Sequence, residues 1–230
     1  MKLPLSNRLL TCCQFIHPGD RVADIGCDHG YLGIHLLKGG IASSVIASDV
    51  NEGPLQSAMM NARKFDVQGQ ISFYLSDGVR NIPRDFDCMV CAGMGADTII
   101  SILEAAPWLK DPKYRLILQC QSKRPELRKY LAASGFAISR ETLAKDGKFI
   151  YPVMEASFAP GSLPASWEYY ITPQLLEDHS PLLPEFLNRV IGGLEDSAKG
   201  ARLEGSEKYE AVTEILSHLY SLKGEKPCQL

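Results

Sequence analysis

The 230-residue sequence has no apolar run close to the roughly 20 residues that a helix needs to cross a bilayer. Its first residues, MKLPLSNRLLTCCQF, lack the long apolar stretch and the small-residue cleavage site of a signal peptide. The seven cysteines are odd in number and do not have the spacing of a disulfide framework. We therefore expect a cytoplasmic protein with reduced thiols and no membrane attachment.

An excess of positive charge is also missing, because the net charge is −3. Hydrophobic residues make up 45% and charged residues 22%, which excludes wholesale disorder and low-complexity architectures. Residues 1–158 carry 18 Lys and Arg against 16 Asp and Glu, a balance of +2, whereas residues 159–230 carry 6 against 11, a balance of −5. Any surface that binds phosphate should therefore lie on the first part of the chain.

Short apolar segments alternate with amphipathic ones through the first 158 residues. This alternation predicts βαβ units and a parallel sheet that is covered on both faces. Two further strand-like runs, 137–143 and 148–158, are close enough to form a hairpin and would add an antiparallel edge. We expect strands at residues 21–26, 44–49, 71–75, 87–92 and 115–119, and helices at 31–37, 55–65, from about 96 to 103, and from 125 to 135.

The character of the chain changes near residue 159, where APGS and Pro164 indicate a linker. Two later segments have helical spacing of apolar residues and predict an antiparallel helical hairpin, with Ser206 as a candidate cap. We therefore expect two domains, residues 1–158 and 159–230. Gly192-Gly193 inside the first helix marks either a break or a close helix–helix contact. The apolar positions are Leu187, Val190, Leu194, Ala198 and Ala201, then Tyr209, Val212, Leu216 and Leu219.

A glycine-rich acidic run follows the first predicted strand, and open α/β sheets bind ligands at the carboxyl ends of their strands. The run is D-x-G-x-D-x-G, in which Asp24 and Asp28 flank Gly26 and Gly30. It is not the G-x-G-x-x-G motif that places a pyrophosphate on a helix N-terminus. Two acidic residues suit a ligand with a cationic amine or sulfonium.

Acidic residues also follow the second and third strands. Asp49 can accept hydrogen bonds from both hydroxyls of a ribose, and Asp77 can accept one from an adenine amino group. With the glycine run they describe a pocket for S-adenosylmethionine, although both residues are also common turn formers and helix caps. The predicted cofactor-binding residues are Asp24, Gly26, Gly30, Asp49, Val50, Asp77, Gly78, Ala92 and Gly93.

These stretches resemble the bacterial TrmK family of tRNA adenine-22 N1-methyltransferases. The matching runs are VADIGCDHGYL at 22–32, ASDVNEGPL at 47–55, SDG at 76–78, AGMG at 92–95, RLILQ at 115–119 and FIY at 149–151. The resemblance covers residues 1 to about 158, and the helical tail fits the family's coiled-coil appendage in kind. It implies a Rossmann-like class I fold with a seven-stranded, mostly parallel sheet, S-adenosylmethionine as cofactor and tRNA as substrate.

Two departures from the family pattern lie where the target base should enter. The family usually reads Gly-Met-Gly-Gly, whereas Ala96-Asp97 follow Gly95 here. It usually has Gln-Pro-Asn after the fifth strand, where this chain has Gln119-Cys120-Gln121.

Methylation of adenine N1 needs mainly orientation in a dry site, because the sulfonium is already activated and N1 has a free lone pair. A nearby carboxylate can stabilise the cationic product or accept its proton. The predicted catalytic residues are Asp28, His29, Tyr31, Gly93 and Met94. Asp28 is the first candidate for the carboxylate, His29 and Tyr31 would bind or stack, and the other two would pack against adenine. The alternative for His29 is a helix-start residue bonded to backbone.

RNA binding needs positive charge, and four cations lie within seven residues beyond the fifth strand. The predicted RNA-binding residues are Arg8, Lys123, Arg124, Arg128 and Lys129. The alternative for this run is a solvated helix face. Cys88 and Cys91 form C-x-x-C within a predicted strand, where their side chains point to opposite faces, so we expect no metal there. We expect a monomer, or a weak homodimer through the C-terminal helices.

Three other functions remain compatible with the sequence. A small-molecule methyltransferase could use the same fold, because fold and cofactor do not fix the substrate. A nicotinamide-dependent oxidoreductase is disfavoured by the missing G-x-G-x-x-G and by Asp28. A module that binds cofactor or RNA without catalysis is left open by the two departures.

Overall fold

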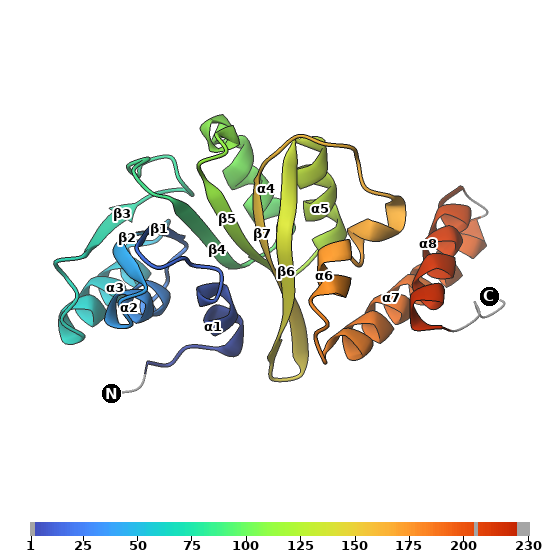
Figure 1. The fold of residues 1–230 in the computed structure, drawn as a ribbon, viewed down its shortest axis with the longest axis horizontal. Coiled ribbons are helices and arrows are strands. Elements are labelled where there is room, and N and C mark those ends of the chain that lie inside the picture. The colour runs from blue at the N-terminus through green and yellow to red at the C-terminus, as the bar shows by residue number, and fades with distance from the viewer. Residues whose placement is uncertain (1–2, 205–206, 225–230) are drawn as a thin grey trace. The chain divides into compact units, whose positions relative to one another are not determined.

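The computed structural model describes residues 3–204 and 207–224, and the chain divides into two compact units, Met1–Ser162 and Leu163–Leu230. Figure 1 shows the helices and strands of both units along the chain. Each unit has its own packed interior and is described by itself. Ser206, the cap expected for the last helix, lies outside the described residues.

The first unit is built on a seven-stranded sheet with the order β3-β2-β1-β4-β5-β7-β6. Strands β1 to β5 pair in parallel, while β7 runs antiparallel to both β5 and β6. The predicted mostly parallel sheet and its antiparallel hairpin are therefore confirmed. The strands are β1 Asp20–Ile25, β2 Ala42–Asp49, β3 Ile71–Leu75, β4 Cys88–Met94, β5 Arg115–Cys120, β6 Phe136–Asp146 and β7 Phe149–Phe158.

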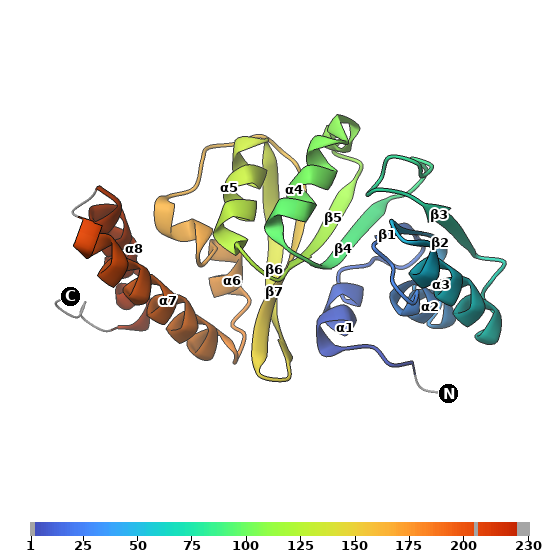
Figure 2. The same ribbon diagram turned by 180° about the vertical axis from the view of Figure 1, so that it is seen from behind.

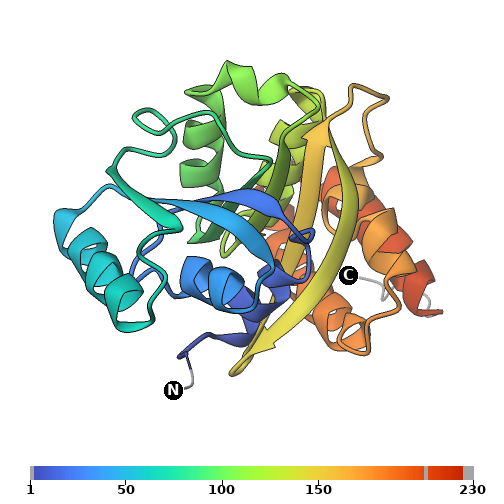
Figure 3. The ribbon, with the colours of Figure 1, turned by 60° about the vertical axis from the view of Figure 1, so that its left-hand side comes forward.

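Helices cover both faces of this sheet, as Figure 3 shows. One core cluster joins α1, α2 and α3 to strand residues such as Val22 and Cys88, and the other joins α4 and α5 to Met89 and Cys91. Cys88 and Cys91 therefore face opposite sides, as their spacing in a strand predicts. The helices are α1 Asn7–Cys13, α2 Tyr31–Lys38, α3 Glu52–Lys64, α4 Ala96–Glu104, the 3₁₀ turn η1 Pro107–Lys110, and α5 Arg124–Ala133.

Two boundaries near the carboxyl ends of the strands differ from expectation. Helix α3 begins at Glu52 rather than at residue 55, because Pro54 in its first turn removes no helical hydrogen bond. Strand β4 continues through Met94, which still pairs with Cys120 after a bulge at Gly93. Gly93 has a φ of +84°, which a glycine adopts without strain. The strand thus extends two residues beyond the predicted end at residue 92.

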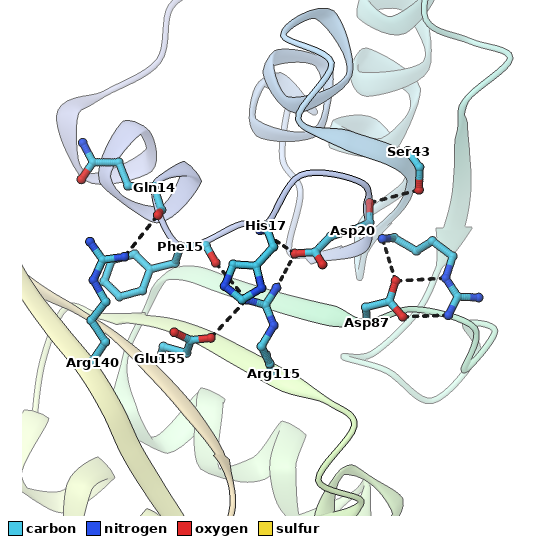
Figure 4. Close-up of polar contacts among 10 residues, drawn as sticks. Gln14, Phe15, His17, Asp20, Ser43, Asp87, Arg115, Arg140 and Glu155 are labelled. Carbon is cyan, nitrogen blue, oxygen red and sulfur yellow. Dashed lines mark hydrogen bonds and ion pairs between the residues drawn. The ribbon is translucent and has the colours of Figure 1, made fainter.

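The amino ends of the strands are joined by ion pairs, which Figure 4 shows in close-up. Arg115 donates to the Phe15 carbonyl at 3.1 Å and to Glu155 Oε1 at 3.2 Å, and it also pairs with Asp20. Arg21 pairs with Asp87 through Nε at 3.1 Å and Nη2 at 2.8 Å. These contacts connect the starts of β1, β4 and β5 at the edge opposite the predicted site.

The second unit is helical: η2 Ser166–Tyr169, α6 Pro173–Glu177, α7 Leu183–Glu204 and α8 Glu207–Lys223. Helices α7 and α8 pack together through buried residues such as Leu194, Ala198 and Leu219, which confirms the predicted helical hairpin. Helix α7 is continuous through Gly192-Gly193, and a side chain at either glycine would meet open space. The expected break or close contact there is wrong. No helix in the described part of the chain is long and apolar enough to cross a membrane.

Candidate active site

The loop between β1 and α2 is held tightly against β2. The backbone N–H groups of Gly26 and Cys27 both donate to the Ser48 carbonyl, at 2.8 and 2.9 Å. A Cβ at Gly26 would lie 2.4 Å from the Met94 methyl, and one at Gly30 would lie 2.9 Å from the Ala58 Cβ. Both glycines also have positive φ, so the loop needs glycine at these two positions.

Asp49 connects two loops at the carboxyl edge of the sheet. Its side chain is buried at the end of β2, where Oδ2 accepts from the Asp28 N–H at 3.1 Å and Oδ1 accepts from the Asn51 N–H at 2.9 Å. Each carboxylate oxygen has further lone pairs for a ligand. Asp49 therefore fixes the loop after β1 against the loop after β2 and can still accept hydrogen bonds.

Asp24 is a buried carboxyl directly behind the glycine loop. Its Oδ2 has no hydrogen-bond partner within residues 3–204 and 207–224, although backbone N–H groups or cations usually satisfy such an atom. Burial raises the pKa of Asp24 to about 7, and the nearby Asp49 charge adds to this effect. A ligand with an ammonium group would donate a hydrogen bond to Asp24 Oδ2 and would bring a positive charge that balances the ionised carboxylate.

Asp28, His29 and Tyr31 lie together at the entrance of the loop. Asp28 has a φ of +51°, a left-handed conformation that aspartate tolerates better than most residues. Its Oδ1 is 3.6 Å from His29 Nε2, and the His29 and Tyr31 rings are 5.8 Å apart. The backbone carbonyl of His29 accepts from Asn61 of α3 at 3.0 Å, so the carbonyl is fixed while the side chain stays exposed.

Gln119 is a further candidate residue that is not among the predicted site residues. It is fully buried at the end of β5, and its Oε1 accepts from the Gly93 N–H at 3.0 Å and from Arg8 Nη1 at 3.1 Å. The bulge turns the Gly93 N–H away from the sheet, and the Gln119 amide satisfies it. Gln119 Nε2 has no partner in the described part of the chain. The polar side chain at the end of a buried strand was the available signal.

The remaining cofactor candidates lie around the end of β3. Asp77 is exposed, and its carboxylate pairs with the neighbouring Arg80 at 3.2 Å. Val50 follows Asp49 in the chain, and Leu75 is the register partner of Asp49 on β3. Both are exposed apolar residues. Gly78 has a positive φ and lies against Ile102. Ala92 is half-buried in β4, next to Gly93.

The loops that carry the two departures from the family pattern contact each other in space. Asp97, at the start of α4, pairs with Lys123 at 2.7 Å. The Gln121 N–H donates to the Met94 carbonyl at 2.8 Å, and the Ala96 N–H donates to the Ser122 carbonyl at 3.3 Å. The loops after β4 and β5 are therefore joined into one wall beside Gly93.

The expected basic run after β5 is divided by the fold. Arg128 is buried and pairs with Glu141 of β6 at 2.5 Å, so the expectation that it lies on an RNA-binding surface is wrong. Arg124 is half-buried, and burial together with the charge of Arg128 lowers its pKa. Lys123 is exposed but pairs with Asp97, and Lys129 is exposed on α5.

No group of three or more metal-binding side chains is found in the residues that the structure covers. The six described cysteines are all buried free thiols. Burial raises the pKa of the Cys88 and Cys91 thiols far above the usual value, which makes both poor nucleophiles.

The fold and the carboxyl-edge geometry place the chain in a known class. The sheet order, with an antiparallel seventh strand beside β5, and the glycine loop between β1 and α2 define a Rossmann-like methyltransferase fold. Residues 5–154 match the family described as "Methyltransferase domain". This match covers more than half of the chain, so the chain belongs to the methyltransferase-domain family.

Curated relatives include tRNA methyltransferases and confirm the resemblance to the TrmK family. The chain is 34% identical over 156 residues to the tRNA (adenine(22)-N(1))-methyltransferase of Bacillus subtilis strain 168, a match that covers 67% of this chain and 66% of the relative. It is 36% identical over 136 residues to a Mycoplasma genitalium protein named as a tRNA methyltransferase, covering 58% and 60%. The matches thus span about three fifths to two thirds of these relatives.

Solved structures extend the likeness over nearly the whole fold. The crystal structure of the B. subtilis m1A22 tRNA methyltransferase TrmK matches with a TM-score of 0.82 and 26% identity, covering 97% of this chain and 99% of that one. A Streptococcus pneumoniae candidate tRNA (m1A22) methyltransferase, in complex with S-adenosyl-L-methionine, matches with a TM-score of 0.80 and 28% identity, covering 92% and 99%.

Proposed function

We propose that this protein transfers a methyl group from S-adenosylmethionine to N1 of adenine 22 in tRNA. The carboxyl edge of the sheet supports this proposal through one observation above all. Two buried carboxylates, Asp24 and Asp49, lie beside a glycine loop and have hydrogen-bonding capacity left for a cationic nucleoside ligand. The named activities of the relatives supply the position on the tRNA.

The residues at this edge suit the parts of the cofactor. Asp24 Oδ2 can accept from the amino group of the methionyl end, which would lie beside the loop that contains Gly26 and Gly30. Asp49 can accept from the ribose hydroxyls. The cofactor supplies the methyl group on an activated sulfonium, so the protein needs to hold the two reactants in line and keep water out.

The adenine of the cofactor would bind next to Asp49. Val50 and Leu75 are exposed although they are apolar, and burying such surface is favourable for a flat base. Asp77 can then accept from the adenine amino group only if it leaves Arg80, with which it pairs at 3.2 Å. Of the acidic strand-end residues, Asp77 therefore contributes the least to cofactor affinity in this proposal.

The target base would enter between the β1 loop and the wall formed after β4 and β5. Gly93 and Met94 can pack on the target adenine of the tRNA, and Asp28 can receive a proton or stabilise the positive charge of the product. His29 and Tyr31 can stack at the entrance, where their rings already lie 5.8 Å apart. Arg8 supplies a cation beside Gly93, because its Nη1 and the Gly93 N–H both donate to Gln119 Oε1.

The two parts of the chain have different tasks in this proposal. Residues 1–158 form the methyltransferase domain, and residues 159–230 form a helical domain. The charge balance of −5 in residues 159–230 disfavours broad phosphate contact there. We therefore place the main phosphate contacts of the tRNA on the first domain.

Methyl transfer to matched tRNA transcripts tests this function. Unmodified bacterial tRNA with adenine at position 22, and the same transcript with guanine there, would each be incubated with labelled S-adenosylmethionine. We expect label only in the first transcript, recovered as N1-methyladenine at position 22. Label at another base would contradict the proposed position, and cofactor binding without transfer to any tRNA would contradict the proposed substrate.

A further inference from the structure

The β6–β7 hairpin projects beyond the carboxyl edge of the sheet. The pairing of β5 with β7 ends at Gln119 and Val153, and the earlier residues of β7 pair with β6 as far as Phe149 and Asp146. Because β7 runs antiparallel to β5, those earlier residues lie past the end of β5. Figures 1 and 2 show this hairpin extending from the sheet beside α1.

The tip of this hairpin, residues 145–149, is fastened close to the candidate site. Asn7 Nδ2 donates to the Lys145 carbonyl at 2.9 Å, and Arg8 Nε lies 3.6 Å from Asp146 Oδ2. The same guanidinium donates through Nη1 to Gln119, whose oxygen also accepts from Gly93. One side chain, Arg8, thus connects the hairpin tip to the bulge beside the target-base entrance.

The tip presents an aromatic ring together with positive charge. Phe149 is 50% exposed, so much of its side chain is open to solvent. Lys148 Nζ lies over its ring, 5.3 Å from the centroid, and the Tyr151 ring lies 6.0 Å away on the same strand. Arg8, Lys145 and Lys148 against Asp146 leave a local balance of +2.

We infer that Phe149 and Lys148 form a stacking platform for an unpaired nucleotide next to the target adenine. This inference rests on the proposed function. A base methylated at its N1 edge has to leave its stack, which leaves its neighbours without a stacking partner. An exposed ring with an adjacent cation binds such a base through its face and the phosphate through charge. The local balance of +2 at the tip favours a polyanion such as RNA as the partner.

Variants of the platform can be compared with a matched pair at the opposite edge. Lys113 is also exposed and lies over a neighbouring ring, 4.8 Å from the Tyr114 centroid, but it precedes β5 at the amino edge. The variants are Phe149→Ala, Phe149→Trp, Lys148→Ala and Lys113→Ala. Fluorescence anisotropy would give Kd for labelled unmodified tRNA, calorimetry would give Kd for S-adenosylmethionine, and circular dichroism would check folding.

The expected pattern separates stacking from general damage. Phe149→Ala should weaken tRNA binding about tenfold, Lys148→Ala less than that, and Phe149→Trp should stay within about twofold of the parent, because any base can stack on tryptophan. Lys113→Ala should leave tRNA binding unchanged. All four should keep the parent's cofactor affinity.

The contrary results can be told apart. If Phe149→Ala binds and methylates tRNA as the parent does, the platform is wrong and the proposed function stands. Equal losses of tRNA affinity in Lys148→Ala and Lys113→Ala would also overturn the platform, because the effect would then be one of overall charge. A folded parent that binds cofactor but neither binds nor methylates tRNA would overturn the proposed function and the platform with it.

Discussion

The two edges of the sheet differ in how their buried or partly buried carboxylates are satisfied. At the amino edge, charged groups satisfy each other: Arg115 binds Asp20, Glu155 and a carbonyl, and Arg21 binds Asp87. At the carboxyl edge, Asp49 is held by two backbone N–H groups, and one oxygen of Asp24 has no partner within the described residues.

This difference separates structural charges from binding charges. A carboxylate that is paired with arginine has little left to offer a ligand, whereas one held by backbone N–H groups keeps its position, its negative charge and its open lone pairs. Leaving a buried polar atom without a partner costs about 1–3 kcal/mol, so such an atom is expected where a ligand recovers that cost. The carboxyl edge is therefore the edge at which we propose that the ligand binds.

Asp49→Ala should show the largest effect, and it tests the difference between the two edges of the sheet most strongly. It removes the acceptor for the proposed ribose hydroxyls and for two loop N–H groups, so Kd for S-adenosylmethionine should rise by at least about 30-fold. Calorimetric titration measures this, with Asp87→Ala as the control from the amino edge. The control should lose thermal stability while its cofactor Kd stays within about twofold. Equal cofactor affinities in both variants would remove the distinction between the edges.

Gln119 offers the next largest effect. Gln119→Ala leaves the Gly93 N–H without its partner, and kcat/KM for methyl transfer should fall about tenfold with cofactor affinity retained. Gln119→Glu keeps the acceptor for Gly93 and Arg8 but loses the Nε2 donor. If the acceptor alone matters, Glu should restore most of the rate; a variant as slow as Ala would show that the donor contacts substrate. Steady-state kinetics with tRNA as the varied substrate makes the comparison.

Asp24 predicts a pH dependence of cofactor binding. Burial raises its pKa to about 7 in the free protein, so the carboxyl loses its charge as the pH falls below that value. A cationic ligand prefers the ionised form, so Kd for S-adenosylmethionine should be about fivefold higher at pH 6 than at pH 8. Asp24→Asn should bind more weakly at pH 8 and lose this dependence. An unchanged pH profile in the variant would exclude Asp24 as its source.

The same raised pKa has a consequence for the stability of the free protein. Because folded Asp24 holds its proton at a higher pH than the unfolded chain does, folding is favoured at low pH, and this contribution is lost as the pH rises toward about 7. The free energy of unfolding of Asp24→Asn should therefore exceed that of the parent more at pH 8 than at pH 5. Denaturant unfolding at the two pH values measures the difference.

Asp87 should give the smallest effect, with the opposite sign. Hydrogen bonds from Arg21 lower its pKa below the usual value, so its contribution to stability is present above about pH 4 and is lost as the pH falls through the lowered pKa. Asp87 is partly exposed to solvent, so Asp87→Asn should lower Tm at pH 7 by less than about 3 °C. The gap between the two proteins should narrow as the pH falls below about 4; a gap that does not change with pH would assign it to packing.

Much of the fold could be predicted because its signals are local. Strand β3 begins and ends where the apolar run 71–75 does, and the strand–helix alternation gave the parallel sheet. The acidic residues at the carboxyl ends of β1 and β2 also followed directly, since every parallel strand ends at the same edge. These features depend on short segments and on one rule of topology.

The contacts that were missed depend on residues far apart in the sequence. Arg128 has the spacing of an exposed cation on a helix, but Glu141 of the neighbouring strand β6 draws it into the interior. Arg8 meets Gln119 across 111 positions of sequence, and the Gly93 bulge that brings them together has no signature beyond a single glycine. Such partners become visible only when the strands are placed side by side.

A crystal structure of the protein with S-adenosylmethionine would show whether the two buried carboxylates bind the cofactor, through their distances to the ligand. We expect ribose hydroxyls within hydrogen-bonding distance of Asp49 and the ligand's amino group within hydrogen-bonding distance of Asp24 Oδ2. A cofactor bound away from both carboxylates, with Asp24 Oδ2 still unpartnered, would contradict this expectation.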